Sequence, residues 1–384
     1  MIETRPPDPR MYDILAEAGF GEDLFSPRQH RCCGLVDRYA LEHATALLPS
    51  LELDALLREP QGVDALMSAR GFAAPFRRPL AWLLSFLAHG EVLAADGGCY
   101  RLVRTLEAPA LAEVRAAVLD TDASFAPALA LLDEAAAIYP RVARGETSGE
   151  RALFLRARLW ADYFDNANGY YGVTNRVAAR AAAARLPPGG RVLEIGAGLG
   201  SATGALLDEP AVPGRLGAYR VTEPVAFFRR RAERTLAAVH PGVPLVFGEL
   251  DLNQPWAAQD VQADGYDLVY GVNVMHLARD LGGALREAQA ALAPGGYLVL
   301  GEGLRPRPEI PVAAELPFQL LESFADVETD PVTRPTAGFL TGETWLTALQ
   351  RAGFADVGLV PDAIRRRAVM PVFLAAAIVG RRPL

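Results

Sequence analysis

A glycine-rich turn within residues 191–207, RVLEIGAGLGSATGALL, carries the clearest chemical signal in the sequence. Its first half reads as a buried strand, and Gly196, Gly198 and Gly200 let the backbone turn tightly and approach a ligand. A helix follows, so its positive N-terminal end faces the same ligand. The preceding Glu194 suits a ligand with a positive amino group and a sulfonium better than a pyrophosphate. The turn predicts an S-adenosylmethionine site, with a ligand-free strand-to-helix connection as the alternative.

Polar side chains also follow the next two strand-like segments. Glu223 ends AYRVTEP, 23 residues after Gly200, where a carboxylate can accept both hydroxyl hydrogen bonds of a ribose. Asp251 and Leu252 follow the third segment, where the acid can accept from an adenine amino group and the leucine can pack on the ring. Ligands of open α/β sheets bind beyond the carboxyl ends of the strands. We therefore expect these residues to bind the cofactor, although each also has an ordinary reading as a cap or turn.

The fourth and fifth segments, YDLVYGVNVMH and YLVLGE, lead to Asn273 and His276 and to Glu302. With the three earlier ones, these strand ends place polar groups at five points in sequence order, which favours one site over five unrelated turns. Two interpretations of Asn273 stay open, because its amide could hold a substrate carbonyl or stabilise a turn.

The chain divides into three regions. Residues 186–384 alternate strand-like runs with amphipathic helices, which indicates an α/β fold with a mainly parallel sheet. Residues 106–185 read as a helical linker and lid. Residues 1–105 read as mostly helical and include a winged-helix pattern, in which a helix from near Leu80 to His89 is followed by a hairpin at Asp96-Gly97-Gly98.

The apolar face of that helix favours burial over nucleic-acid binding. We expect it to form a dimer interface or an internal packing surface, and we expect a homodimer. The side chains concerned are Leu80, Trp82, Leu83, Leu84, Phe86 and Leu87.

Composition narrows the functional classes. The net charge is −8 without a long basic run, so nucleic acid is not the expected partner. Three cysteines, no apolar signal segment and no run of about 18 apolar residues predict a cytoplasmic protein without a membrane anchor. We expect no bound metal, because no Cys or His cluster has ligand spacing.

The sequence resembles class I methyltransferases with a Rossmann-like, seven-stranded sheet, and among them the C-methyltransferase domains of polyketide synthases. The stretches that carry the resemblance are VLEIGAGLGSATG, YRVTEPVAFFRRRAE, LDLNQPW, YDLVYGVNVMHLARDLGGALREAQAALAPGGYLVLGE and LQRAGFADV. Glu223 stands where that family usually has aspartate. The winged-helix region instead resembles the dimerisation domain of small-molecule O-methyltransferases, which leaves the acceptor open more than the cofactor.

The resemblance implies that His276 and Glu302 are a catalytic pair. A neutral imidazole can act as general base near pH 7, and the glutamate can orient it and stabilise the imidazolium. It also implies a β-ketoacyl acceptor, free or bound to a carrier protein, that is methylated on carbon. Methylation of a phenol or carboxyl oxygen is the first alternative, and a regulator that keeps the fold without methylating is the second. LARD after His276 favours carbon, because O-methyltransferases have His-Asp-Trp there.

Two aromatic groups are candidate substrate residues. Tyr170 and Tyr171, with Tyr163, could form a lid over a sulfonium, since aromatic faces attract cations. Phe318 and Phe324, with Leu321 between them, could line an acyl pocket. Ordinary packing is the alternative for both groups.

Overall fold

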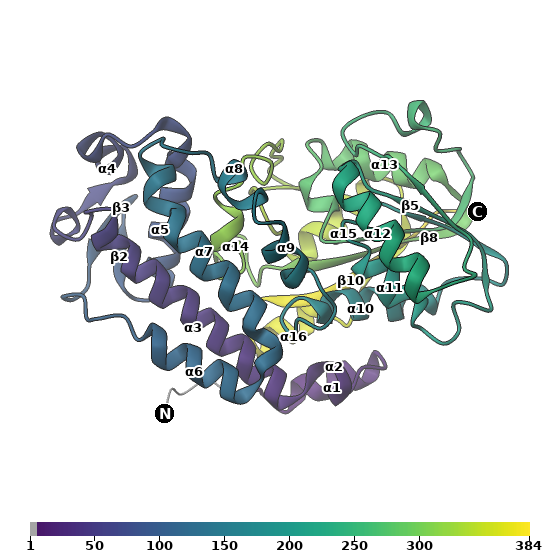
Figure 1. Cartoon of the computed structure of the whole chain (residues 1–384), viewed down its shortest axis with the longest axis horizontal. Coiled ribbons are helices and arrows are strands. Elements are labelled where there is room, and N and C mark those ends of the chain that lie inside the picture. The colour runs from purple at the N-terminus through teal and green to yellow at the C-terminus, as the bar shows by residue number, and fades with distance from the viewer. Residues whose placement is uncertain (1–5) are drawn as a thin grey trace.

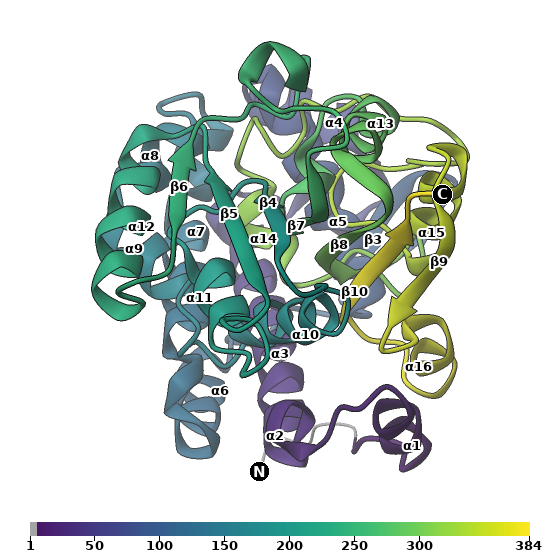
Figure 2. The ribbon, with the colours of Figure 1, turned by 90° about the vertical axis from the view of Figure 1, so that its right-hand side faces the viewer.

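A seven-stranded sheet forms the centre of the C-terminal half of the chain. The computed structural model describes residues 6–384. Figure 2 shows the strands in the order β6-β5-β4-β7-β8-β10-β9, in which only β10 runs antiparallel to its neighbours. This arrangement confirms the Rossmann-like, seven-stranded α/β prediction. The strands are β4 (Gly190–Glu194), β5 (Leu216–Thr222), β6 (Leu245–Gly248), β7 (Tyr266–Val272), β8 (Leu292–Leu304), β9 (Ala355–Val360) and β10 (Leu374–Arg381).

Helices cover both faces of this sheet because its strands are apolar on both sides. Val192 of β4 packs with α10 and α11, whereas the next residue, Leu193, packs with α13 and α15 on the other face. A further helix, α12, lies over the β6 edge, and α16 joins β9 to β10. These helices are α10 (Gly172–Ala183), α11 (Ser201–Leu207), α12 (Ala226–Val239), α13 (Leu281–Ala291), α15 (Gly342–Arg351) and α16 (Ala363–Val369).

The N-terminal half is mostly helical and lies beside the sheet (Figure 1). A three-stranded antiparallel sheet, in the order β1-β3-β2, packs against α5 and forms the far end. The helices are α1 (Arg10–Glu17), α2 (Glu22–Phe25), α3 (Pro27–Ser50), α4 (Val63–Arg70), α5 (Arg77–His89), α6 (Leu111–Thr121), α7 (Ala126–Ala143), α8 (Gly149–Phe154) and α9 (Ala157–Tyr163). The short strands are β1 (Gln61–Gly62), β2 (Leu93–Asp96) and β3 (Cys99–Leu102).

The helix and hairpin expected near residues 80–100 are present. Helix α5 ends at His89, and β2 pairs with β3 across the turn at Gly97 and Gly98. However, the apolar face of α5 is buried within the same chain, with Leu80, Leu83 and Leu84 fully covered. This face is therefore not available to a second subunit. The homodimer stays a prediction, but the apolar face of α5 no longer supports it.

Packing crosses the boundaries expected from the sequence. Helices α6 and α7, which lie beyond residue 105, share one hydrophobic core with α3 and α5. The segment 313–324, which includes α14 (Glu315–Phe318), joins that core although it follows β8 in the chain. Conversely, α1, α2 and α10 pack on the sheet. Figure 1 shows α9 and α14 between the N-terminal helices and the sheet, at the place where the two halves meet.

Two element boundaries bear on the site. Helix α13 ends at Ala291, and Leu292 pairs with Tyr266 of β7. Pro294 favours extended backbone before it, which explains this end. Glu302 does not end β8, because the strand continues to Leu304 by pairing with β10. Within residues 6–384, no helix is long and apolar enough to cross a membrane, and no group of three potential ligand side chains is placed to hold a metal.

Candidate active site

The glycine turn connects β4 to α11 with all three glycines in the left-handed region. A β-carbon on Gly196 would lie 2.2 Å from Cγ2 of Val274, and one on Gly200 would lie 2.9 Å from Cδ1 of Leu236. Both positions therefore exclude a side chain because protein packs against them. Gly198 differs, because a β-carbon there would meet nothing within 4 Å. Of the three glycines, only Gly198 opens directly onto space that a ligand can use.

A pocket lies beyond the carboxyl ends of β4, β5, β6 and β7, and we call it the cofactor pocket. Its walls combine the backbone of the turn with polar and apolar side chains. The predicted residues among them are Gly196, Gly198, Glu223, Asp251, Leu252 and Asn273, and Phe228, Leu250 and Asn253 join them. Gly200 is not part of the lining and acts through its contact with α12.

Glu223 holds the turn and the cofactor pocket together. Its Oε2 accepts from the backbone N–H of Gly198 at 2.9 Å, and its Oε1 accepts from that of Val225 at 2.9 Å. Burial raises the pKa of this carboxyl, while the two backbone N–H groups oppose the increase. Each carboxylate oxygen can accept a second hydrogen bond, so Glu223 can still bind a pair of ribose hydroxyls.

Asp251 and Leu252, which follow the neighbouring strand β6, also line the cofactor pocket. Oδ1 of Asp251 accepts from the backbone N–H of Asn253 at 2.9 Å, which leaves Oδ2 available. Leu252, with Leu250 and Phe228, supplies the apolar surface that an adenine ring needs. Together with Glu223 and the open Gly198, these groups fit S-adenosylmethionine in their donor and acceptor chemistry.

Glu194 differs from expectation. Its side chain is fully buried beneath the turn, where Oε2 accepts from the hydroxyls of Thr203 and Tyr219, each at 2.7 Å. Burial raises its pKa to about 7, and the charge of Glu223 adds to this. Glu194 does not line the cofactor pocket, because these two hydroxyls hold it in the core. Its position indicates support of the turn and not direct contact with a ligand.

His276, in the short turn after β7, meets Glu302 near the end of the neighbouring parallel strand β8. Nδ1 of His276 lies 2.7 Å from Oε2 of Glu302, and both side chains are buried. An ionised carboxylate only accepts, so Nδ1 carries the proton and Nε2 keeps its lone pair. Among residues 6–384, Nε2 has no hydrogen-bond partner. His276 lines a second pocket, so this lone pair is available to a ligand there.

Aromatic side chains enclose that second pocket, which we call the acceptor pocket. All four predicted substrate residues line it: Tyr170, Tyr171, Phe318 and Phe324. The ring of Phe324 has its centroid 6.0 Å from that of His276 and packs edge-on to it. The further lining residues include Trp160, Tyr163, Phe164, Leu321, Phe339 and Phe373.

The acceptor and cofactor pockets share one wall, whose members are Phe164, Tyr171, Asn273, Leu277 and Ser323. Burial raises the pKa of the Tyr171 phenol to about 12, and its hydrogen bond with Asn273 opposes the increase. Asn273 has φ +50°, and its Oδ1 accepts from the backbone N–H of Gly303 at 3.2 Å. The Asn273 side chain therefore links the end of β7 to β8 through this hydrogen bond. Its amide lies in the wall between the two pockets.

Sequence reasoning missed Arg334 and Phe339. Buried Arg334 donates to the backbone carbonyls of His276 and Ala278, and so fixes the turn that presents the imidazole. The ring of Phe339 lies 5.0 Å, centroid to centroid, from that of His276. Both come from residues 322–340, which form no long element, so no periodic pattern could have indicated them.

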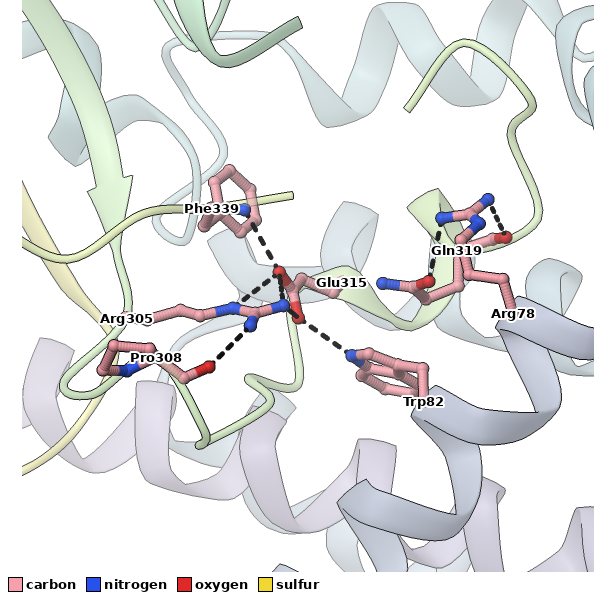
Figure 3. Close-up of polar contacts among 7 residues, drawn as sticks. All are labelled: Arg78, Trp82, Arg305, Pro308, Glu315, Gln319 and Phe339. Atoms are coloured by element: carbon pink, nitrogen blue, oxygen red, sulfur yellow. Dashed lines mark hydrogen bonds and ion pairs between the residues drawn. The ribbon is translucent and has the colours of Figure 1, made fainter. Parts of the chain in front are cut away.

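A buried ion pair ties the acceptor pocket to the N-terminal helices (Figure 3). Glu315, at the start of α14, accepts from Arg305 at 2.6 Å and from Nε1 of Trp82 in α5 at 2.8 Å. It also accepts from the backbone N–H of Phe339 at 3.2 Å. Arg78 of α5 donates to the backbone carbonyl of Gln319 at 2.8 Å. Helix α5 thus holds the segment that carries Phe318 into the acceptor pocket.

Comparison with known proteins identifies the class. Residues 170–359 match the family described as "Methyltransferase domain". The fold and the site therefore define a methyltransferase that uses S-adenosylmethionine.

Several of its relatives among curated proteins are polyketide synthases. Polyketide synthase ThaG of Burkholderia thailandensis is 30% identical over 315 residues, which cover 77% of this chain and 5% of ThaG. Tenellin synthetase of Beauveria bassiana is 34% identical over 168 residues, which cover 44% of this chain and 4% of the synthetase. The chain thus spans about a twentieth of the length of these relatives.

Two solved structures share the fold over nearly the whole chain. The CurJ carbon methyltransferase has a TM-score of 0.78 and 22% identity, with 98% of this chain and 97% of that one covered. The DszA carbon methyltransferase has a TM-score of 0.76 and 21% identity, with 99% and 97% covered. The likeness includes the N-terminal helices as well as the sheet. Residues 170–359 thus form a methyltransferase domain, and the whole chain shares its fold with these two carbon methyltransferases.

Proposed function

We propose that the protein methylates the α-carbon of a β-ketoacyl thioester. The observation that carries this proposal is the buried His276–Glu302 pair, whose free Nε2 faces an aromatic pocket beside the cofactor pocket. Methylation at carbon requires a base, because a C–H bond must lose its proton before the carbon can attack. The neutral imidazole supplies that base, and Glu302 stabilises the positive charge that forms on the ring.

The residues of the cofactor pocket divide the work of binding. Glu223 would accept from the ribose hydroxyls, Asp251 from the adenine amino group, and Leu252 would pack on the adenine. When bound, S-adenosylmethionine supplies an electrophilic methyl group on its sulfonium, and the rest of the cofactor departs as a neutral thioether. No residue therefore has to protonate a leaving group.

The acceptor pocket supplies orientation and a dry environment. Its aromatic walls exclude water, so the enolate formed by His276 is not readily reprotonated. The Asn273 amide, on the wall shared with the cofactor pocket, can donate to a carbonyl oxygen of the enolate. Two carbonyls flank the α-carbon of a β-ketoacyl group, which makes its proton removable by an imidazole. An acceptor carried as a thioester on a carrier protein is consistent with the relatives, which are polyketide-type synthases.

The test uses deuteromethyl-labelled S-adenosylmethionine with two acceptors, a β-ketoacyl thioester and a hydroxyaromatic acid. Mass spectrometry and NMR locate the label in each product. A label on the α-carbon is the expected result. A label on oxygen would instead establish the O-methyltransferase alternative and overturn the proposal.

A further inference from the structure

A second cavity lies next to the acceptor pocket, between α3 and the start of β10. Three parts of the chain line it. Phe25 at the end of α2 and Asp37 in α3 form one part, Tyr170 before α10 forms the second, and Arg366 of α16 forms the third. Met11 of α1 also contributes, and Figure 2 shows α1 beneath α16. This cavity is distinct from the acceptor pocket but adjoins it, and we call it the distal cavity.

Two buried polar groups in the distal cavity have no partner among residues 6–384. They are Nε of Arg366 and the hydroxyl of Tyr170. The Arg366 side chain is 4% exposed, with its guanidinium 4.8 Å above the Phe25 ring and one N–H donated to the carbonyl of Ala375 at 3.1 Å. Buried polar groups in native proteins are almost always paired, so these two indicate a missing partner.

Asp37 adds an acceptor to the same cavity. Its carboxyl has no ion pair or hydrogen bond in the described part of the chain, and burial raises its pKa to about 7. Asp37 and Tyr170 line the same cavity, and burial, followed by the charge of Asp37, raises the pKa of the Tyr170 phenol. The cavity thus presents a cationic donor, a hydroxyl and a carboxyl, together with apolar side chains and the further polar residues Gln29, His30, Cys33 and Thr174.

The distal cavity adjoins the acceptor pocket through a shared set of residues, Tyr170, Thr174 and Phe373. An extended acceptor whose reacting carbon lies at His276 would have to pass Tyr170 to enter this cavity. A carboxylate on that chain would pair with Arg366 but be repelled by Asp37, and an ammonium would pair with Asp37 but be repelled by Arg366. A neutral group that both donates and accepts satisfies both residues.

We propose that the distal cavity binds an amide or hydroxyl group of the acceptor chain, remote from the carbon that is methylated. Arg366 and Tyr170 donate to the oxygen of that group, and Asp37 accepts from its N–H or O–H. Met11 and Phe25 cover the methylenes beside it. This inference rests on the proposed function for the direction of the chain. The group can come from a pantetheine arm, which carries amides, or from a hydroxylated acyl tail.

Four substrates separate these two sources. Each combines one carrier, N-acetylcysteamine or pantetheine, with one acyl group, 3-oxobutanoyl or a longer 3-oxoacyl group with a hydroxyl near its end. Asp37→Asn and Arg366→Met are the test variants. Glu17→Gln is the matched control, because it removes the exposed ion pair of Arg365, next to Arg366, without lining the cavity.

We expect the two test variants to lower kcat/KM at least tenfold, through KM, for the substrates that reach the cavity and not for the short ones. If kcat/KM falls only for the pantetheine substrates, the group bound in the distal cavity belongs to the pantetheine arm. If kcat/KM falls only for the substrates with the long acyl group, the bound group is the hydroxyl of the acyl tail. Glu17→Gln should match the wild type with every substrate. Equal losses with all four substrates, or no loss with any, would overturn the proposal.

Binding is measured separately by calorimetry with free pantetheine and with the neutral methyl ester of the long hydroxylated acyl chain, on protein saturated with S-adenosylhomocysteine. Weaker binding of a probe to Asp37→Asn than to wild type supports a binding role for the distal cavity, whether or not any substrate is methylated. Absence of methylation would refute only the proposed function. Equal binding of both probes to wild type and to the variant overturns the inference. Thermal unfolding of Arg366→Met shows whether that variant folds, and Asp37→Asn, which keeps the side-chain shape, decides the outcome if it does not.

Discussion

Nδ1 of His276 lies 2.7 Å from Oε2 of Glu302, within a buried pair that joins the turn after β7 to strand β8. The carboxylate fixes the proton on Nδ1 and leaves Nε2 as the base. Arg334 donates to the backbone carbonyl of His276. Glu302 therefore fixes the imidazole ring, and Arg334 fixes the backbone that carries it.

Replacing the base tests its role in turnover. His276→Ala should lower kcat by about 10²–10⁴-fold, the range that general-base catalysis supplies, with little change in cofactor affinity. Glu302→Gln should lower kcat in the same direction, because an amide can no longer hold the imidazole in its basic tautomer. Steady-state kinetics and calorimetry with S-adenosylhomocysteine measure the two effects. His240→Gln, outside both pockets, is the control, and unchanged turnover in His276→Ala would remove His276 from the mechanism.

Gly198 offers a test of the cofactor pocket. Gly198→Ala should cost about 1 kcal/mol of stability, because the backbone is left-handed, and should weaken cofactor binding at least tenfold, because the methyl enters the pocket. Gly189→Ala is a matched control, since Gly189 also has a left-handed backbone and open space around its β-carbon. Denaturant unfolding and calorimetry should show equal stability losses but weaker binding only for Gly198→Ala. Equal binding by both variants would contradict the assignment of the pocket.

The buried Glu315 links stability to the acceptor pocket. Glu315→Gln leaves Arg305 buried without its counter-charge and should cost about 3–5 kcal/mol in the free energy of unfolding. It should also raise KM for the acceptor, since α14 carries Phe318 into the pocket. Asp64→Asn, which breaks an exposed pair with Arg77, should change neither. Equal unfolding midpoints for the two variants in urea would contradict the role given to Glu315.

Glu194 predicts a pH dependence of stability. Its pKa is about 7 in the folded protein and 4.5 as a reference, so the folded state holds the proton more tightly. Its contribution is complete below pH 4.5 and is lost as the pH rises to about 7, by on the order of 3 kcal/mol at most. Urea unfolding between pH 4.5 and 8 should show this fall in the wild type and a smaller one in Glu194→Gln. An equal slope in both proteins would contradict the assignment.

The sequence contained most of the fold and the polar residues of the site, for physical reasons. Periodic apolar runs indicated the strands, and parallel strands bring Glu223, Asp251 and His276 to one edge of the sheet. The direction of the Glu194 side chain was not readable, because it depends on Thr203 and Tyr219 in other elements.

The contacts between the N-terminal helices and the acceptor pocket could not be predicted from the sequence either. The apolar face of α5 indicated burial but not its partner, which is in the same chain. Its polar contacts to the acceptor pocket join residues more than 200 positions apart, such as Trp82 and Glu315. Local patterns carry no information about such pairs.

The most direct test of the central claim measures proton removal without methyl transfer. A β-ketoacyl thioester is incubated in deuterium oxide with the protein and S-adenosylhomocysteine, and NMR follows exchange of the α-proton above the rate without protein. Wild type should exchange this proton at least 10²-fold faster than His276→Ala. Equal rates for the two proteins would contradict the claim that His276 is the base that prepares a carbon for methylation.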